Sequence, residues 1–342
     1  MKKFFMTTSI SVLVLTLLLI SGCGGEKGTT PGTTSTGDGG GMNLLTYLPD
    51  SASGVFTFNF KEVAKLELFD EMVKDAEAKA DAESGKAFKN YQDFVDKTGI
   101  DPKKDIHSVA MAVLGKLGAE EPDAVVVINL NYDKDKIMAI LKQEKVEFTE
   151  EMYKDIAILS VKEDSDQNVF AFINDSVVAA GKIDGVKKVI DLSKGEGQSV
   201  MANARLKPYI EKFSGMISFV IEFPEDAKKV HQLPMGAVDL SKAEVILGEF
   251  NFSSSAYTGE ISLICANEEG NNQLVTTLNG FKGMAGMMGP EAVELVNKIE
   301  LTASADKVTL SFDIPQELLE KLKKKMAEKT KGMMPTETEP GE

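Results

Sequence analysis

The sequence predicts an α+β fold, in which antiparallel sheets carry helices packed on one face. Two observations lead to this class. Segments with an apolar residue at every second position recur along the chain, and this is the period of a strand with one buried face. Helical segments stand between groups of these strands instead of following each strand, which favours antiparallel pairing over a parallel sheet.

A strand that runs directly into a helix occurs four times. The junctions are Phe56–Phe60 into Lys61–Lys65, Val126–Leu130 into Asp133–Leu141, Phe219–Phe223 into Pro224–Val230, and Leu310–Ile314 into Pro315–Leu322. Proline fits the first turn of a helix, and acidic residues there suit the helix dipole. Because the last two intervals between junctions are nearly equal, the sequence predicts a duplicated strand-helix unit.

The remaining elements follow from the same periodicities. Further strands are expected at Ile106–Leu114, Ile156–Val161, Val169–Ile173, Val177–Ala180, Val245–Phe252 and Glu260–Ala266. Further helices are expected at Val63–Lys97 (broken near Ser84), Val186–Leu192, Ala202–Phe213, Asn272–Phe281 and Pro290–Lys298. Asn174 and Asp175 predict a hairpin turn between two of the strands.

The first residues have the order of a secretory signal. Lys2 and Lys3 precede the apolar run Ile10–Ile20, which is shorter than the roughly 20 residues that span a bilayer. The following stretch Leu19–Cys23 resembles the bacterial lipobox. That resemblance implies a bacterial lipoprotein that is cut before Cys23 and carries acyl chains such as palmitate on this cysteine. Two or three chains hold a protein on a membrane more firmly than one chain does.

Composition divides the chain into five parts. They are a signal peptide (1–22), the lipidated cysteine with a flexible tether (23–42), a first α+β unit (43–230), a second α+β unit (231–328) and a disordered tail (329–342). The tether is rich in glycine, threonine and serine, a composition typical of flexible linkers. The tail is polar and contains Pro335 and Pro340.

Charge and cysteine content narrow the classes of partner. The formal net charge of -15 becomes -17 in the mature chain, because Lys2 and Lys3 are removed with the signal. This acidity argues against binding to nucleic acid or to anionic lipid headgroups. Once Cys23 is lipidated, Cys265 has no partner for a disulfide within the chain. Its apolar surroundings predict a buried thiol that is not a nucleophile.

Three short motifs support a second resemblance. Leu48-Pro49-Asp50, the stretch Lys97–Asp105 and the stretch Asp175–Gly181 occur in this order. Together they resemble a family of extracytoplasmic bacterial proteins that is known only as a domain of unknown function. The resemblance covers Leu45–Phe223, whereas Ala243–Met326 departs from it. It implies an extracytoplasmic α+β domain with no assigned activity.

The lipoprotein resemblance also implies a location. Gly24 follows the lipidated cysteine, where an aspartate usually retains lipoproteins at the inner membrane. We therefore expect the anchored domain to face outside the cytoplasm, at the outer membrane if the envelope has two membranes.

Catalytic and metal-binding motifs do not emerge from the sequence. His107 and His231 are the two histidines, and both are expected to be structural or surface residues. The motifs G-x-S-x-G, H-E-x-x-H, C-x-x-C and G-x-x-x-x-G-K-[ST] do not occur. We therefore predict no cofactor and no metal site, and lean against an enzyme; a hydrolase with a carboxylate-based site is the least favoured hypothesis.

The segment that contains Phe281, Met284, Met287 and Met288 has glycine at every third position. Methionine fills irregular cores, and it also lines adaptable surfaces that bind apolar partners. Its thioether suits Cu(I) as well. The sequence therefore leaves three uses of this segment open: core packing, a surface for an apolar ligand or partner, and copper binding.

These observations favour a non-catalytic, membrane-anchored lipoprotein that binds a partner or supports the envelope. The alternative is a carrier or chaperone for an apolar ligand. A deep apolar cavity beneath Phe281–Met288 would favour the carrier, and a closed core would favour the partner-binding protein.

Overall fold

The computed structural model describes residues 44–67, 69–71, 73–74, 91–115, 123–143, 146–161, 168–233, 236–287, 289–322 and 324. The predicted signal, Cys23, the tether and the predicted tail lie outside the described residues. Met288 and the middle of the predicted helix 63–97 lie outside them as well.

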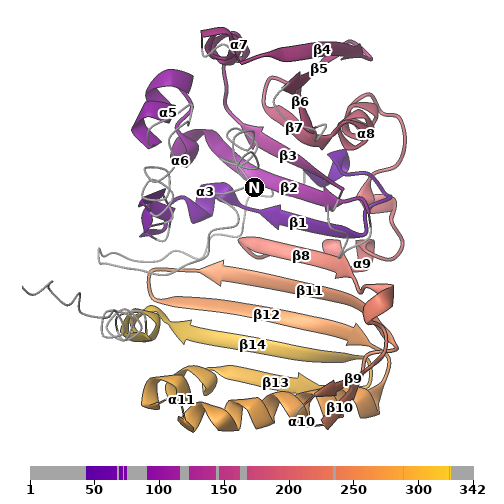
Figure 1. The fold of residues 1–342 in the computed structure, drawn as a ribbon, viewed down its shortest axis with the longest axis vertical. Coiled ribbons are helices and arrows are strands. Elements are labelled where there is room, and N and C mark those ends of the chain that lie inside the picture. Colours follow the sequence, from indigo (N-terminus) through magenta and orange to yellow (C-terminus); the bar gives the residue numbers. More distant parts are fainter. Residues whose placement is uncertain are drawn as a thin grey trace, which may run out of the picture.

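Twelve of the described strands form one antiparallel sheet. All the described strands, including the two outside this sheet, are β1 (Gly54–Phe58), β2 (Ile106–Val113), β3 (Ala124–Leu130), β4 (Phe148–Tyr153), β5 (Ile156–Val161), β6 (Asn168–Asn174), β7 (Val177–Lys182), β8 (Ile217–Glu222), β9 (Val230–Leu233), β10 (Gly236–Asp239), β11 (Ala243–Phe252), β12 (Ala256–Cys265), β13 (Ile299–Ala303) and β14 (Lys307–Pro315). Their order in the sheet is β13-β14-β12-β11-β8-β1-β2-β3-β7-β6-β5-β4, and β9 and β10 form a separate hairpin (Figure 1).

Helices connect the strands and cover the sheet. The α-helices are α3 (Phe60–Val63), α5 (Tyr91–Thr98), α6 (Pro102–Asp105), α7 (Lys134–Gln143), α8 (Ile183–Ser193), α9 (Lys207–Ile210), α10 (Glu268–Met284) and α11 (Pro290–Val296). The 3-10 helices are η1 (Leu45–Tyr47), η2 (Val200–Ala202), η3 (Glu225–Ala227) and η4 (Ala285–Met287). Residues 316–322 are also helical.

The alternation along β1 defines the two faces of the sheet. Val55 and Thr57 point to one side, and Phe56 and Phe58 point to the other. The strand register carries this alternation to the neighbouring strands, so that Val220 of β8 lies beside Val55 and Phe219 lies beside Phe56. We call the side of Val55 the α8 face and the side of Phe56 the α10 face.

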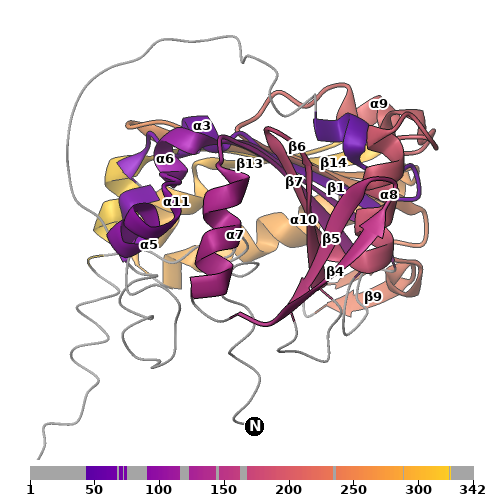
Figure 2. The same cartoon turned by 90° about the horizontal axis from the view of Figure 1, so that it is seen from above.

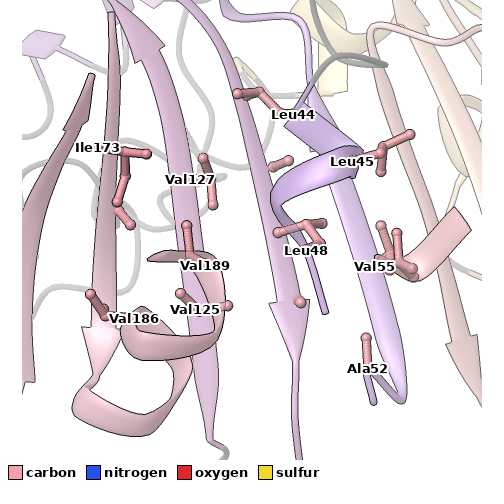
Figure 3. Close-up of a cluster of buried hydrophobic side chains, with 14 of the residues drawn as sticks. Leu44, Leu45, Leu48, Ala52, Val55, Val125, Val127, Ile173, Val186 and Val189 are labelled. Atoms are coloured by element: carbon pink, nitrogen blue, oxygen red, sulfur yellow. The ribbon is translucent and has the colours of Figure 1, made fainter. Parts of the chain in front are cut away.

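The α8 face holds the main core. Val55, Val125 and Val127 are fully buried there against η1, α8 and α9. Figure 3 shows Val186 and Val189 of α8 beside the strand that carries Val125 and Val127. Each fully buried valine or leucine contributes about 1.5–3 kcal/mol to folding, so this cluster stabilises the sheet from β5 to β11.

The α10 face is covered at two places. A second cluster, with Phe60, Phe69 and Ile128, lies beneath α3, α5 and α7. Farther along the sheet, α10 contacts β13 and β14, whose apolar residues point to the same side as Phe56. Figure 2 shows that β4 and β5 bend toward the side on which α7 and α10 lie.

The predicted α+β class and the antiparallel pairing are confirmed. One detail of that prediction is wrong, because helices pack on both faces and not on one. The reason is that several strands have apolar residues on both sides; in β3, Val127 belongs to the first cluster and Ile128 to the second. The duplicated unit and the division at residue 230 stay predictions.

One predicted helix, 202–213, is wrong over most of its length. The structure has only η2 and the four-residue α9 in this region. The side chain of Asn203 accepts hydrogen bonds from the backbone N–H groups of Arg205 and Leu206, and this forms a turn where the helix was expected. Pro208 also has no backbone N–H to offer to a longer helix.

Candidate functional site

The C-terminal end of α10 presents apolar side chains to solvent. Phe281, Met284 and Met287 are 42%, 46% and 77% exposed, and they are three of the five large apolar side chains that are exposed among the described residues. We call these three residues the Phe–Met surface. Their spacing of three residues places them near one another along α10 and η4. Their exposure shows that these side chains do not fill the core.

Two contacts hold this surface against the sheet. Ala285 is buried, although its neighbours in sequence are exposed. The Nζ atom of Lys282 donates a hydrogen bond to the backbone oxygen of Ile299 in β13. The Phe–Met surface therefore belongs to a helix that is docked on the sheet.

The helix itself begins earlier than the sequence indicates. Asn267 is its N-cap, and the Asn267 side chain accepts a hydrogen bond from the backbone N–H of Gly270. Glu268 and Glu269 lie in the first turn, where a negative charge suits the helix dipole. At the other end, a Cβ added at Gly283 or Gly286 would meet no atom within 4 Å, so these glycines are not required by packing.

A row of four phenylalanines crosses the α10 face between its two covered regions. Ring centroids lie 5.7 Å apart for Phe56 and Phe219, 6.1 Å for Phe219 and Phe250, and 6.0 Å for Phe250 and Phe312. All four rings are half-buried, whereas Val55 and Val220 on the opposite face are fully buried. The rings thus form an apolar strip that is in part accessible to water.

Glycines on the neighbouring strands make room for this row. A Cβ at Gly248 would lie 2.5 Å from the ring of Phe219, and a Cβ at Gly259 would lie 2.6 Å from the rings of Phe250 and Phe312. The row also leads toward the Phe–Met surface. Its last ring, Phe312, is paired with Ile299, the residue whose backbone oxygen binds Lys282.

The two histidines lie on strands. His107 is in β2, where its Nε2 atom lies 3.3 Å from Oδ1 of Asn131, and His231 is in β9. Among the described residues, no group of three or more histidine, cysteine, aspartate and glutamate side chains is arranged to hold a metal ion.

Cys265 lies at the end of β12 and is buried, as its apolar neighbours predict. Burial raises the pKa of its thiol, and Asp239 and Glu244 raise it further. The thiolate that would act as a nucleophile is therefore disfavoured at neutral pH.

In the part of the chain that the structure describes, no helix is both long and apolar enough to cross a membrane. Cys23, the predicted lipid attachment site, lies outside that part.

Comparison with known proteins gives a likeness in fold only. No family model matches the sequence, and no curated protein matches it. The structure is similar to crystal form III of TP0453, with 12% identity and a TM-score of 0.46 over 83% of this chain and 97% of that chain. Crystal form I of TP0453 gives 12% identity and a TM-score of 0.43 over 83% and 96%. At this level of similarity, no property of TP0453 is transferred to this chain.

Proposed function

We propose that this chain is a membrane-anchored, extracytoplasmic lipoprotein without catalytic activity, which binds an envelope protein through the Phe–Met surface. The observation that carries the proposal is the joint exposure of Phe281, Met284 and Met287 at one end of α10. The lipobox Leu19–Cys23 supplies the anchor in this proposal.

The side chains of the Phe–Met surface and of the segment around it are of types that suit binding to a protein. Soluble proteins keep large apolar side chains apart on their surfaces, and clustered ones mark interaction sites. Methionine side chains adapt to differently shaped apolar partners because they are unbranched and polarizable. The segment from Gly280 to Pro290 contains no carboxylate, although the chain has 53 aspartate and glutamate residues. Depletion of charge is typical of the centre of an interface.

Site-specific photocrosslinking in the native host tests this proposal. A photoreactive amino acid replaces Met287 in one variant and Met152 of β4 in another; Met152 is also a solvent-exposed methionine, at 61%. We expect a discrete protein adduct from position 287 and not from position 152. We also expect Phe281→Ser to remove the adduct. Equal adducts from both positions, or none from position 287, would contradict the proposal.

A second candidate, a carrier for an apolar ligand, is supported by the phenylalanine row. Half-buried rings on a sheet face offer a strip along which an acyl chain can lie. The test is binding of a fluorescent fatty acid to the wild type and to Phe219→Ser with Phe250→Ser. We expect at least tenfold weaker binding by the double variant if the chain is a carrier. Val230→Ser, a change at an exposed valine in β9, is the control.

A further inference from the structure

A polar cavity of about 330 Å³ is lined by residues that belong neither to the Phe–Met surface nor to the phenylalanine row. Its walls come from the loop before α9, from α9, from the end of β8 and from the start of β11. The cavity contains Arg205, which is the single arginine of the chain. Its volume falls at the lower end of the range for small-molecule sites.

Glu222, which lines the cavity, has a carboxylate oxygen that lacks a hydrogen bond. Oε1 of Glu222 is shielded from solvent and has no hydrogen-bond partner among the described residues. A guanidinium nitrogen of Arg205 lies 2.8 Å away as an ion pair, but without the angles of a hydrogen bond. A buried acceptor in this state is stabilised by any donor that reaches it.

The charges around this oxygen have both signs. Lys228 pairs with Glu225 at 2.7 Å, and Glu244 is a third carboxylate on the wall. The side chain of Arg205 is 74% exposed, so it has N–H groups left to donate to an incoming anion. The carboxylates of the cavity can therefore accept hydrogen bonds from a cation, and the guanidinium group of Arg205 can donate hydrogen bonds to an anion.

Aromatic residues complete the lining. Tyr209 and Phe223 both contribute to the wall, and a ring face attracts an ammonium group. Burial raises the pKa of Tyr209, and Glu244 and Asp306 raise it further, so its hydroxyl keeps its proton at neutral pH. Burial also raises the pKa of Glu222, against the opposing effect of Arg205 and Lys228. A cationic ligand would stabilise the charged form of this carboxylate.

The backbone around Arg205 is fixed before any ligand arrives. Oδ1 of Asn203 accepts hydrogen bonds from the N–H groups of Arg205 and Leu206. Nδ2 of Asn203 donates to the backbone oxygens of Asp50 and Ala52. This anchoring lowers the entropy that a ligand would otherwise lose on ordering the loop.

We propose that this cavity binds a small zwitterion, with the ammonium and carboxylate groups of a free amino acid. The ammonium group lies against Glu222 and Glu244, and the carboxylate accepts hydrogen bonds from Arg205. This site is separate from the Phe–Met surface, so the inference does not depend on the proposed partner.

Isothermal titration calorimetry of the full chain in detergent tests the inference. The probes are L-alanine, L-glutamine and L-lysine, together with ethylamine and propionate, which each carry one of the two charged groups. We expect at least one amino acid to bind at least tenfold more tightly than either single-charge probe. Arg205→Gln and Glu222→Gln should each weaken that binding at least tenfold.

Lys207→Gln and Glu211→Gln are the matched controls, because these residues form an exposed ion pair at the two ends of α9 and do not line the cavity. Both controls should bind like the wild type. Circular dichroism establishes that each variant is folded. The inference is overturned if no amino acid binds at millimolar concentration, if ethylamine or propionate binds as tightly as the amino acids, or if Arg205→Gln and Glu222→Gln bind like the wild type.

Discussion

At the scale of single residues, two glycines decide how the α10 face is built. Gly248 and Gly259 lie where a side chain would overlap the rings of Phe219, Phe250 and Phe312. Both glycines lie inside strands, Gly248 in β11 and Gly259 in β12, where glycine costs conformational entropy. Their role could not be predicted from the sequence, because it depends on which strands are neighbours and in which register.

The first prediction concerns Gly248. We expect Gly248→Ala to lower the free energy of unfolding by about 1–3 kcal/mol, because the new methyl group forces the ring of Phe219 to move. Urea unfolding measures this change. Gly283→Ala is the control; its site is open and helical, so this substitution should stabilise by up to about 1 kcal/mol. A smaller cost of Gly248→Ala in a Phe219→Ala background would identify the clash as the cause; an equal cost would refute it.

At the scale of elements, the alternating strands and the amphipathic helices were predictable. β5 is found at the residues that the sequence predicts, and α10 contains the whole predicted helix. β4 was not predicted, because Glu150 and Glu151 interrupt its alternation and its burial is slight. A strand of this kind at the edge of a sheet is set by its neighbour and not by its own apolar pattern.

The candidate site was predictable only in part, because its use also depends on the neighbouring elements. The glycine and methionine composition singled out Phe281, Met284 and Met287, but it could not decide between core and surface use. That choice depends on how α10 docks against β13 and β14, which is a tertiary property. The phenylalanine row and the cavity at Arg205 were not predicted. Each is formed by residues from separate elements, and a local sequence pattern does not predict which of these elements lie together.

The second prediction belongs to α6. Its N-cap, Asp101, accepts hydrogen bonds from the backbone N–H of Lys103 and from the hydroxyl of Tyr91, and it pairs with Lys104. Burial opposes ionisation, but the hydrogen bonds from Lys104, Tyr91 and Lys103 outweigh it and lower the pKa of Asp101. The charged form therefore stabilises the fold above the unfolded pKa of 3.8, and this stability is lost as the pH falls through the lower folded value.

We accordingly expect Asp101→Ala to cost about 0.5–2 kcal/mol at pH 7. The difference from the wild type should shrink below pH ~4, because the Asp101 carboxyl takes up a proton first in the unfolded chain and, at lower pH, in the folded protein. Thermal unfolding between pH 3 and pH 7 measures it, with Asp313→Ala, a change at an exposed carboxylate of β14, as the control. If the difference in stability between the wild type and Asp101→Ala stays constant over this pH range, the charge of Asp101 does not stabilise the fold.

At the scale of the whole molecule, one sheet carries features of three kinds. Its α8 face is closed by buried aliphatic residues. Its α10 face has half-buried rings and leads to the exposed end of α10. The polar cavity lies beside α9. In the proposed arrangement, the lipid on Cys23 holds this domain at a membrane, and the tether lets its surfaces reach a partner.

The third prediction concerns the anchor. Cells fed labelled palmitate should label the wild-type protein, because the lipobox ends at Cys23. Cys23→Ala should remain unlabelled and uncleaved, since the acceptor thiol is gone. Gel electrophoresis with detection of the label measures both outcomes. Label that persists in Cys23→Ala would refute the assignment of this cysteine.

The central claim is that the Phe–Met surface binds a partner in the envelope. It is tested most directly by the size of the protein's complex in detergent-solubilised envelopes, measured on native gels for the wild type, for Phe281→Ser with Met287→Ser, and for Met152→Ser. The wild type and Met152→Ser should migrate as the same complex, larger than the isolated chain. The double variant should migrate as the isolated chain, while its melting temperature stays that of the wild type because both side chains are exposed. A double variant that keeps the larger complex, or a wild type that migrates alone, would contradict the claim.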